Sequence, residues 1–116
     1  MGSAAVFFSV VTGLVMIASG AFDLTLPPKV VALMGRLGQR PNFARTLGVL
    51  KILGGVGLFI GFIIGPIGIL AALGLVIFFV LAVRAHAKLG DSGAETVPAA
   101  ALFILSALTL ITNLFS

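Results

Sequence analysis

Residues 52–83 form one continuous apolar stretch without an ionisable side chain, and only the Gly65-Pro66 step breaks its helical pattern. A single helix of that length would measure roughly 48 Å, whereas the hydrocarbon core of a bilayer is about 30 Å thick. The stretch therefore cannot cross a membrane once and remain in lipid. It predicts two spans that fold back at the Gly-Pro step, and hence an integral membrane protein.

The rest of the chain extends this pattern to four apolar runs. Backbone N–H and C=O groups find no water inside lipid, so each run is expected to be a helix that pairs these groups internally. The predicted fold is all-α: a four-helix transmembrane bundle in a single integral membrane domain, residues 1–116. Gly65 and Pro66 have the positions of a helix C-cap and a first-turn proline, which predicts a very tight connection. The predicted spans cover about residues 4–24, 46–65, 66–86 and 97–115.

The composition supports a membrane protein and excludes several functional classes. Hydrophobic residues make up 60% of the chain and charged residues 9%, far from the balance of a soluble domain. With no Cys and one His, neither a disulfide nor an ordinary metal site is expected. No residues have the spacing of a nucleophile and its base, so no catalytic residue is predicted. The net charge of +4 is explained by membrane topology, and no nucleic-acid partner is expected.

The positive charges gather on one side of the predicted bundle. The first connection between spans carries Lys29, Arg36, Arg40 and Arg45, the third carries Arg84 and Lys88, and Lys51 lies nearest the same side. These are all seven Lys and Arg residues of the chain. The positive-inside rule places this side in the cytoplasm and both termini outside it, in a plasma membrane. Small residues at 18–21 would suit a cleaved signal peptide, but no basic segment precedes the first span, so it is expected to be retained.

The first connection also has an amphipathic pattern. Val30, Leu33, Met34 and Leu37 follow helical spacing on one face, after Pro27-Pro28 and before Gly38. This predicts a short helix that lies in the headgroup region, with its basic side chains near anionic lipids. A docking surface for a partner protein is the alternative. Asp91 and Glu95, in the third connection, are expected to be solvated.

Small residues mark the second and third spans. Gly54, Gly57, Gly61 and Gly65 share one sector of the second helix, and Gly68, Ala71, Ala72 and Gly74 are small residues on the third. Such spacing lets two helix backbones approach closely. It predicts helix packing, either inside one bundle or along a seam between copies of the chain. Ser and Thr hydroxyls in the spans are expected to bond their own helix, and Asn113 to be interfacial.

Asp23, Lys51 and His86 are the candidate ligand-binding residues. They lie toward the cytoplasmic ends of three different predicted spans, so a bundle could gather them into one polar pocket. A buried Lys needs a carboxylate partner, and Asp23 is the only carboxylate before Asp91, which predicts an Asp23–Lys51 ion pair. The structural alternative is that Lys51 extends to the headgroups, Asp23 ends a helix and His86 is merely juxtamembrane.

Four stretches resemble the DoxX-like family of small four-helix membrane proteins. They are ASGAFDL (18–24), TLGVLKILGGVGL (46–58), PIGILAA (66–72) and AVRAH (82–86), in this order across nearly the whole chain. The resemblance implies a membrane subunit linked to an oxidoreductase such as thiosulfate:quinone oxidoreductase, or an assembly factor for membrane proteins. It implies a quinone or lipid as ligand, with no cofactor held by the chain alone. Family members often carry an acidic residue where Lys51 stands, which weakens any transfer of enzymatic function.

The functional expectation is therefore a small membrane accessory protein that binds a lipid or quinone and a partner membrane protein, or that forms a homo-oligomer. A four-helix transporter of the small multidrug resistance type is one alternative. Such antiporters resemble one another in a glutamate within the first span, where this chain has no acidic residue before Asp23. A membrane enzyme that acts on a lipophilic substrate at Asp23, Lys51 and His86 is another.

Overall fold

The computed structural model describes residues 2–90 and 93–115, without the side chains of 93–95. This part of the chain folds into five helices and no strand: α1 (Ser3–Leu24), α2 (Pro28–Arg36), α3 (Phe43–Ile60), α4 (Gly65–Lys88) and α5 (Gly93–Leu114). Four of them, α1, α3, α4 and residues Thr96–Leu114 of α5, are long and apolar enough to cross a membrane. The all-α fold with four spans and a short helix between the first two is confirmed. Asp91 and the side chain of Glu95 lie outside the described residues.

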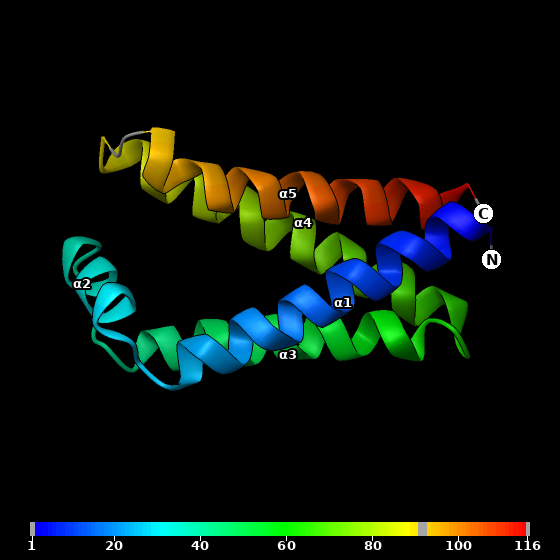
Figure 1. Ribbon diagram of the computed structural model, residues 1–116, viewed down its shortest axis with the longest axis horizontal. Helices are drawn as coiled ribbons and strands as arrows, with labels where there is room; N and C mark the ends of the chain where they lie inside the picture. The colour runs from blue at the N-terminus through cyan, green and yellow to red at the C-terminus, as the bar shows by residue number, and fades with distance from the viewer. Residues whose placement is uncertain (1, 91–92, 116) are drawn as a thin grey trace.

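The long helices form two antiparallel pairs, α1 with α3 and α4 with α5 (Figure 1). Tight contacts between α3 and α4, and between α1 and α5, join the pairs. Both termini lie at one end of the bundle and α2 at the other, as an even number of spans requires (Figure 1). The longest dimension is 41 Å, close to the thickness of about 40–45 Å of a bilayer with its headgroups.

Glycines allow α1 and α3 to touch backbone to backbone. A Cβ added at Gly20 would lie 2.5 Å from the Gly48 carbonyl oxygen, and one added at Gly48 would lie 2.6 Å from the Gly20 carbonyl oxygen. Gly55 makes the same kind of contact with the Gly13 carbonyl oxygen, at 2.8 Å. Because the helices are antiparallel, glycines seven residues apart on each helix meet in two pairs. This small-residue seam was not predicted from the sequence.

A second set of small residues packs α3 against α4. A Cβ at Gly54 would meet the Leu75 side chain, and one at Gly57 would lie 2.8 Å from the Ala71 Cβ. A Cβ at Gly61 would lie 2.6 Å from the Gly68 Cα, near the turn between the helices. The structure thus places these three glycines between helices of one chain.

Gly65 differs from the other predicted packing glycines. It begins α4, and a Cβ there would meet nothing within 4 Å. The turn occupies residues 61–64, so α3 ends earlier than the predicted end of the second span at residue 65. The close approach of Gly61 to Gly68 explains the difference, because the chain must reverse immediately after Ile60 to bring these backbones together.

The outer surface of the helices is apolar. The core is small, with Met16, Leu58, Ala72, Leu75 and Phe79 at its centre. Large apolar side chains cover the outside instead: Leu53 is 61% exposed, Leu70 67% and Ile77 53%. Such a surface is unfavourable in water but matches the hydrocarbon of a bilayer.

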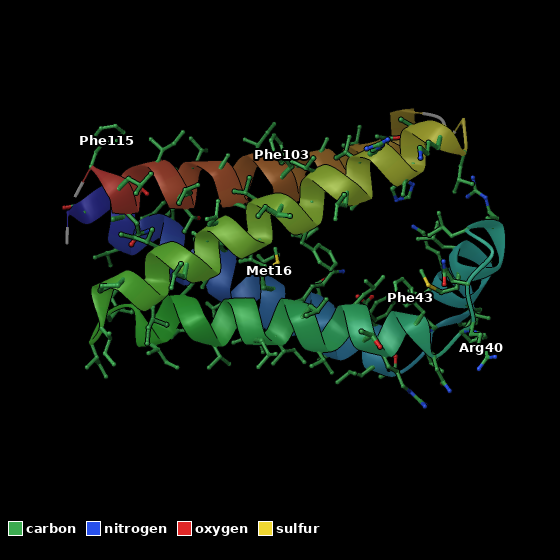
Figure 2. All side chains as sticks on the ribbon, turned by 180° about the vertical axis from the view of Figure 1, so that it is seen from behind. Met16, Arg40, Phe43, Phe103 and Phe115 are labelled. Atoms are coloured by element: carbon green, nitrogen blue, oxygen red, sulfur yellow. The ribbon has the colours of Figure 1, made fainter. Side chains whose placement is uncertain are left out.

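The α2 segment lies at one end of the bundle, against α3 (Figure 1). Leu26, with a positive φ of 52°, and Pro27 turn the chain out of α1 into this helix. Met34 is buried and Val30 and Leu37 are half-buried, whereas Lys29 and Arg36 are exposed, so burial follows the predicted amphipathic face. Arg40 and Phe43 lie at this end of the molecule and Phe115 at the opposite end (Figure 2). The basic residues of both long connections therefore share one end.

Candidate functional site

A buried ion pair links α1 to α3 beneath the cationic end. Lys51 Nζ on α3 donates a hydrogen bond to Asp23 Oδ2 at 2.8 Å and a second one to Ser19 Oγ at 3.0 Å, both on α1. The side chains of Lys51 and Asp23 are 14% and 12% exposed. The ion pair predicted from the sequence is present.

The fold determines why these three side chains meet. Ser19 and Asp23 are one helical turn apart on α1, so they face the same direction. The neighbouring Gly20–Gly48 contact brings α1 and α3 close enough for Lys51, about one turn after Gly48, to reach both of them. Lys51 is eight residues into α3, or roughly 12 Å along its axis. Its side chain extends toward the cationic end, where the ammonium bonds to Asp23 in the last turn of α1 and to Ser19 one turn before it.

The ammonium retains bonding capacity beyond this pair. A Lys ammonium has three N–H donors, of which two go to Asp23 and Ser19. In residues 2–90 and 93–115, no third hydrogen-bond acceptor contacts it, and the Phe78 ring of α4 lies with its centroid 5.9 Å from Nζ. This distance is at the limit of a cation–π contact, about 6 Å. The site therefore has an N–H donor available to a ligand beside an aromatic ring.

His86 also belongs to α4, but two turns beyond Phe78. Eight residues of helix correspond to roughly 12 Å along the axis. Phe78 is thus the α4 side chain that the structure places beside Lys51, a residue that sequence reasoning did not select. The part taken by His86 in ligand binding stays a prediction. No three His, Cys, Asp or Glu side chains lie close enough for a metal in the part of the chain that is described.

Arg45 joins the end of α1 to the start of α3 at the cationic end. Arg45 Nε donates to the Leu24 carbonyl oxygen at the C-terminus of α1, at 3.4 Å, and Arg45 Nη1 donates to Asn42 Oδ1 at 3.2 Å. A cation at a helix C-terminus is favoured by the helix dipole. The Lys51–Asp23 pair therefore lies between an apolar bundle and a cationic rim.

A second polar cluster joins α1 to α5 in the half of the bundle nearer the termini. Thr12 Oγ1 and Thr109 Oγ1 are 2.8 Å apart, and both residues are fully buried. Asn113 Nδ2 donates to Ser9 Oγ at 3.0 Å and to the Thr109 carbonyl oxygen at 2.7 Å. Thr109 also bonds its own helix at the Leu105 carbonyl oxygen, as expected, but the contacts between helices were missed. Ser9 and Thr12 share one face of α1, and Thr109 and Asn113 share one face of α5. This spacing in the sequence could have predicted the contacts.

An apolar groove runs between α3 and α4 on the outside of the bundle. It has a volume of about 400 Å³ and is lined by small and aliphatic side chains of both helices. Phe78, which lies beside the Lys51 ammonium, is also part of its lining. The groove and the ion pair therefore share a side chain.

Comparison with known proteins agrees with this architecture. The family model of the DoxX-like family matches residues 7–108. The chain belongs to the DoxX-like family. The match spans all four membrane-crossing helices apart from the first turn of α1 and the end of α5, and it contains Ser19, Asp23, Lys51 and Phe78. No curated protein and no solved structure matched the chain.

Family membership and the four apolar helices together make this a small multi-pass membrane protein. The resemblance inferred from the four sequence stretches is confirmed. Apolar side chains on the outside of the helices contact membrane lipid. The DoxX-like chain has its polar groups in two internal clusters, of which only the Lys51–Asp23 pair is ionic in the described part.

Proposed function

We propose that this DoxX-like protein is a membrane accessory subunit that binds a quinone or lipid at Lys51 and acts together with a partner membrane protein. The observation that carries the proposal is the Lys51 ammonium, which is bonded to Asp23 and Ser19 within the apolar bundle. Ionisable residues at membrane depth cost free energy and most often mark functional sites. The ligand-binding residues of the proposal are Lys51, Asp23 and Ser19, with Phe78 beside them.

The partners of the Lys51 ammonium support a site over simple snorkelling. A Lys near a helix end lowers its free energy by extending its stem to the headgroups. Here the ammonium is held by two side chains of α1, and one of them, Asp23, compensates its charge at 2.8 Å. Taking both ions out of water costs free energy that their attraction only partly offsets, so the pair is weak support for stability alone.

The charge balance of the site favours a neutral ligand. Lys51 and Asp23 carry opposite charges, so an anionic headgroup would meet no net positive field at the pair itself. A carbonyl oxygen of a quinone or of a lipid ester accepts a hydrogen bond without bringing a charge into the bundle. The remaining N–H of Lys51 is the donor that such an oxygen would use.

A partner supplies the chemistry in this proposal. The sequence has no Cys and one His, so a redox ligand bound at Lys51 would exchange its electrons with another protein. The apolar outer surface of the helices suits contact with a partner in the membrane, and the exposed basic face of α2 suits one at the surface. The plasma membrane, with α2 on the cytoplasmic side and both termini outside, is the proposed location.

The proposal is tested with a decyl-tailed benzoquinone as probe. Purified protein in detergent is titrated with the probe, and native mass spectrometry counts bound quinone in wild type, Lys51→Met and Ser19→Ala. Lys29→Met is the matched control, because Lys29 is an exposed cation on α2. Loss of one charge-assisted hydrogen bond predicts at least about tenfold weaker binding for Lys51→Met.

The outcomes separate a binding site from a structural pair. Weakened binding in Lys51→Met with a normal helical circular dichroism spectrum, and unchanged binding in Lys29→Met, supports the site. Equal binding in wild type and Lys51→Met contradicts it. Native mass spectrometry of the protein extracted from native membranes shows whether a stoichiometric partner stays bound. Proton-coupled uptake of a cationic dye by liposomes containing the protein would instead favour a transporter.

A further inference from the structure

We infer that the groove between α3 and α4 holds the hydrocarbon tail of a neutral amphiphile whose carbonyl head binds Lys51. This inference rests on the proposed function and extends it from the head to the whole ligand. The bound molecule would lie along the outside of α3 and α4, with its head beneath the cationic rim. The ligand would enter the site laterally from the bilayer.

The chemistry of the groove fits a tail. Its walls are the exposed side chains of Leu53 and Leu70, and its floor is made of Gly57, Ala71 and Gly74. The side chains that line it are all apolar. Small residues along the floor bring a ligand close to both helix backbones, which increases the number of dispersion contacts.

Phe78 belongs both to the lining of the groove and to the surroundings of Lys51, which does not itself line the groove. Its ring lines one end of the groove and lies 5.9 Å from Lys51 Nζ. The groove follows α4 from Ile67 to Phe78, roughly 16 Å along the helix axis. This length matches about half of a 30 Å hydrocarbon core, the thickness of one leaflet. A tail that starts at Lys51 would therefore extend toward the opposite leaflet.

The neutrality of the head site selects this occupant over others. A phospholipid phosphate would bring a negative charge to an ammonium whose charge Asp23 already compensates at 2.8 Å. A helix of a second copy could fill the groove, but its main-chain carbonyl oxygens are already bonded within the helix. A neutral carbonyl head with one long tail satisfies both the N–H donor and the groove.

Gly74 provides a direct way to close the groove. It is exposed in the groove floor, and a Cβ at this position would meet nothing within 4 Å. Gly74→Leu therefore adds a large apolar side chain to the groove from a position where the Cβ itself meets no described atom. Ala101→Leu is the matched control, because Ala101 is an exposed small residue on α5, outside the groove.

The test uses two quinone probes with the same head, one with a decyl tail and one without a tail. Binding of each is measured by native mass spectrometry in wild type, Gly74→Leu and Ala101→Leu. Loss of the tail contacts predicts about tenfold weaker binding of the decyl probe to Gly74→Leu alone. The probe without a tail is expected to bind all three proteins equally.

Each result decides between the head site and the groove. Unchanged decyl binding in Gly74→Leu overturns the groove inference and leaves the proposed head site standing. If wild type binds neither probe, the proposed function fails and the inference fails with it. A change from oligomer to monomer in Gly74→Leu, with decyl binding unaltered, would assign the groove to a second copy and also overturn the inference.

Discussion

The backbones of Gly20 and Gly48 touch where α1 crosses α3: a Cβ on either residue would lie within 2.6 Å of the other's carbonyl oxygen. Two turns away, a Cβ on Gly55 would lie 2.8 Å from the Gly13 carbonyl oxygen. Without a hydrophobic driving force between helices in lipid, close packing of this kind is a main source of association. The Lys51–Asp23 pair lies one turn from the Gly20–Gly48 contact and depends on it for its geometry.

Gly48→Ala is therefore expected to destabilise the bundle. The added methyl group meets a carbonyl oxygen of α1, which cannot rotate away as a side chain could, so α1 and α3 must separate. Overpacking of this kind costs about 1–3 kcal/mol. The free energy of unfolding is measured by titration with sodium dodecyl sulfate, followed by circular dichroism.

Gly74→Ala is the control for Gly48→Ala. A Cβ at Gly74 meets nothing, and Ala is the better helix former, so this variant should gain about 0.5–1 kcal/mol. Equal effects of the two substitutions would show that the α1–α3 contact is looser than described.

Removing both partners of the ion pair is expected to cost less than the sum of the two single removals. Lys51→Met leaves the Asp23 carboxylate largely buried without its partner, and Asp23→Asn does the same to the ammonium. Each single change should destabilise the protein by about 3 kcal/mol. The double variant should fall short of the sum by about 1–3 kcal/mol in a double-mutant cycle. Additive effects would mean that the two side chains do not interact.

The Thr12–Thr109 contact is expected to contribute little despite its complete burial. Thr109→Val removes a hydroxyl group that bonds both Thr12 and the Leu105 carbonyl oxygen, with little change in shape. Hydrogen bonds between membrane helices contribute about 0.6 kcal/mol on average and at most about 1.7. Thr109→Val should therefore be less destabilising than Lys51→Met in the same unfolding assay. The reverse order would make the α1–α5 cluster the principal polar contact of the bundle.

Properties set by local sequence were predicted well. The lengths of the apolar runs predicted the four spans, and the spacing of Val30, Met34 and Leu37 predicted the buried face of α2. The partner of Lys51 was also predictable, because Asp23 was the only nearby carboxylate in the sequence. Each of these follows from hydropathy or from charge balance, which do not depend on how the helices pair.

Properties set by helix pairing were missed or misplaced. The glycines at 13 and 20 matter only because α1 is antiparallel to α3, and Gly48 lies opposite Gly20 only at this crossing. The turn at residues 61–64 was placed too late because Gly65-Pro66 gave a strong local signal, while the Gly61–Gly68 approach gave none. Phe78 was overlooked since nothing local distinguishes it from the other phenylalanines of the spans.

The central claim is that the four long helices cross a membrane, with the cationic end inside. The chain has no Cys, so single cysteines can report accessibility directly. Ser3→Cys and Phe115→Cys mark the termini, Arg40→Cys marks the cationic end, and Ile77→Cys marks an apolar side chain that is 53% exposed in the isolated molecule.

Labelling of intact cells with a membrane-impermeant maleimide tests all four positions together. We predict that Ser3→Cys and Phe115→Cys react in intact cells and that Arg40→Cys reacts only after the membrane is permeabilised. Ile77→Cys should react only when the protein is denatured, because lipid covers it. Labelling of Arg40→Cys in intact cells, or of Ile77→Cys in the native membrane, would contradict the claim.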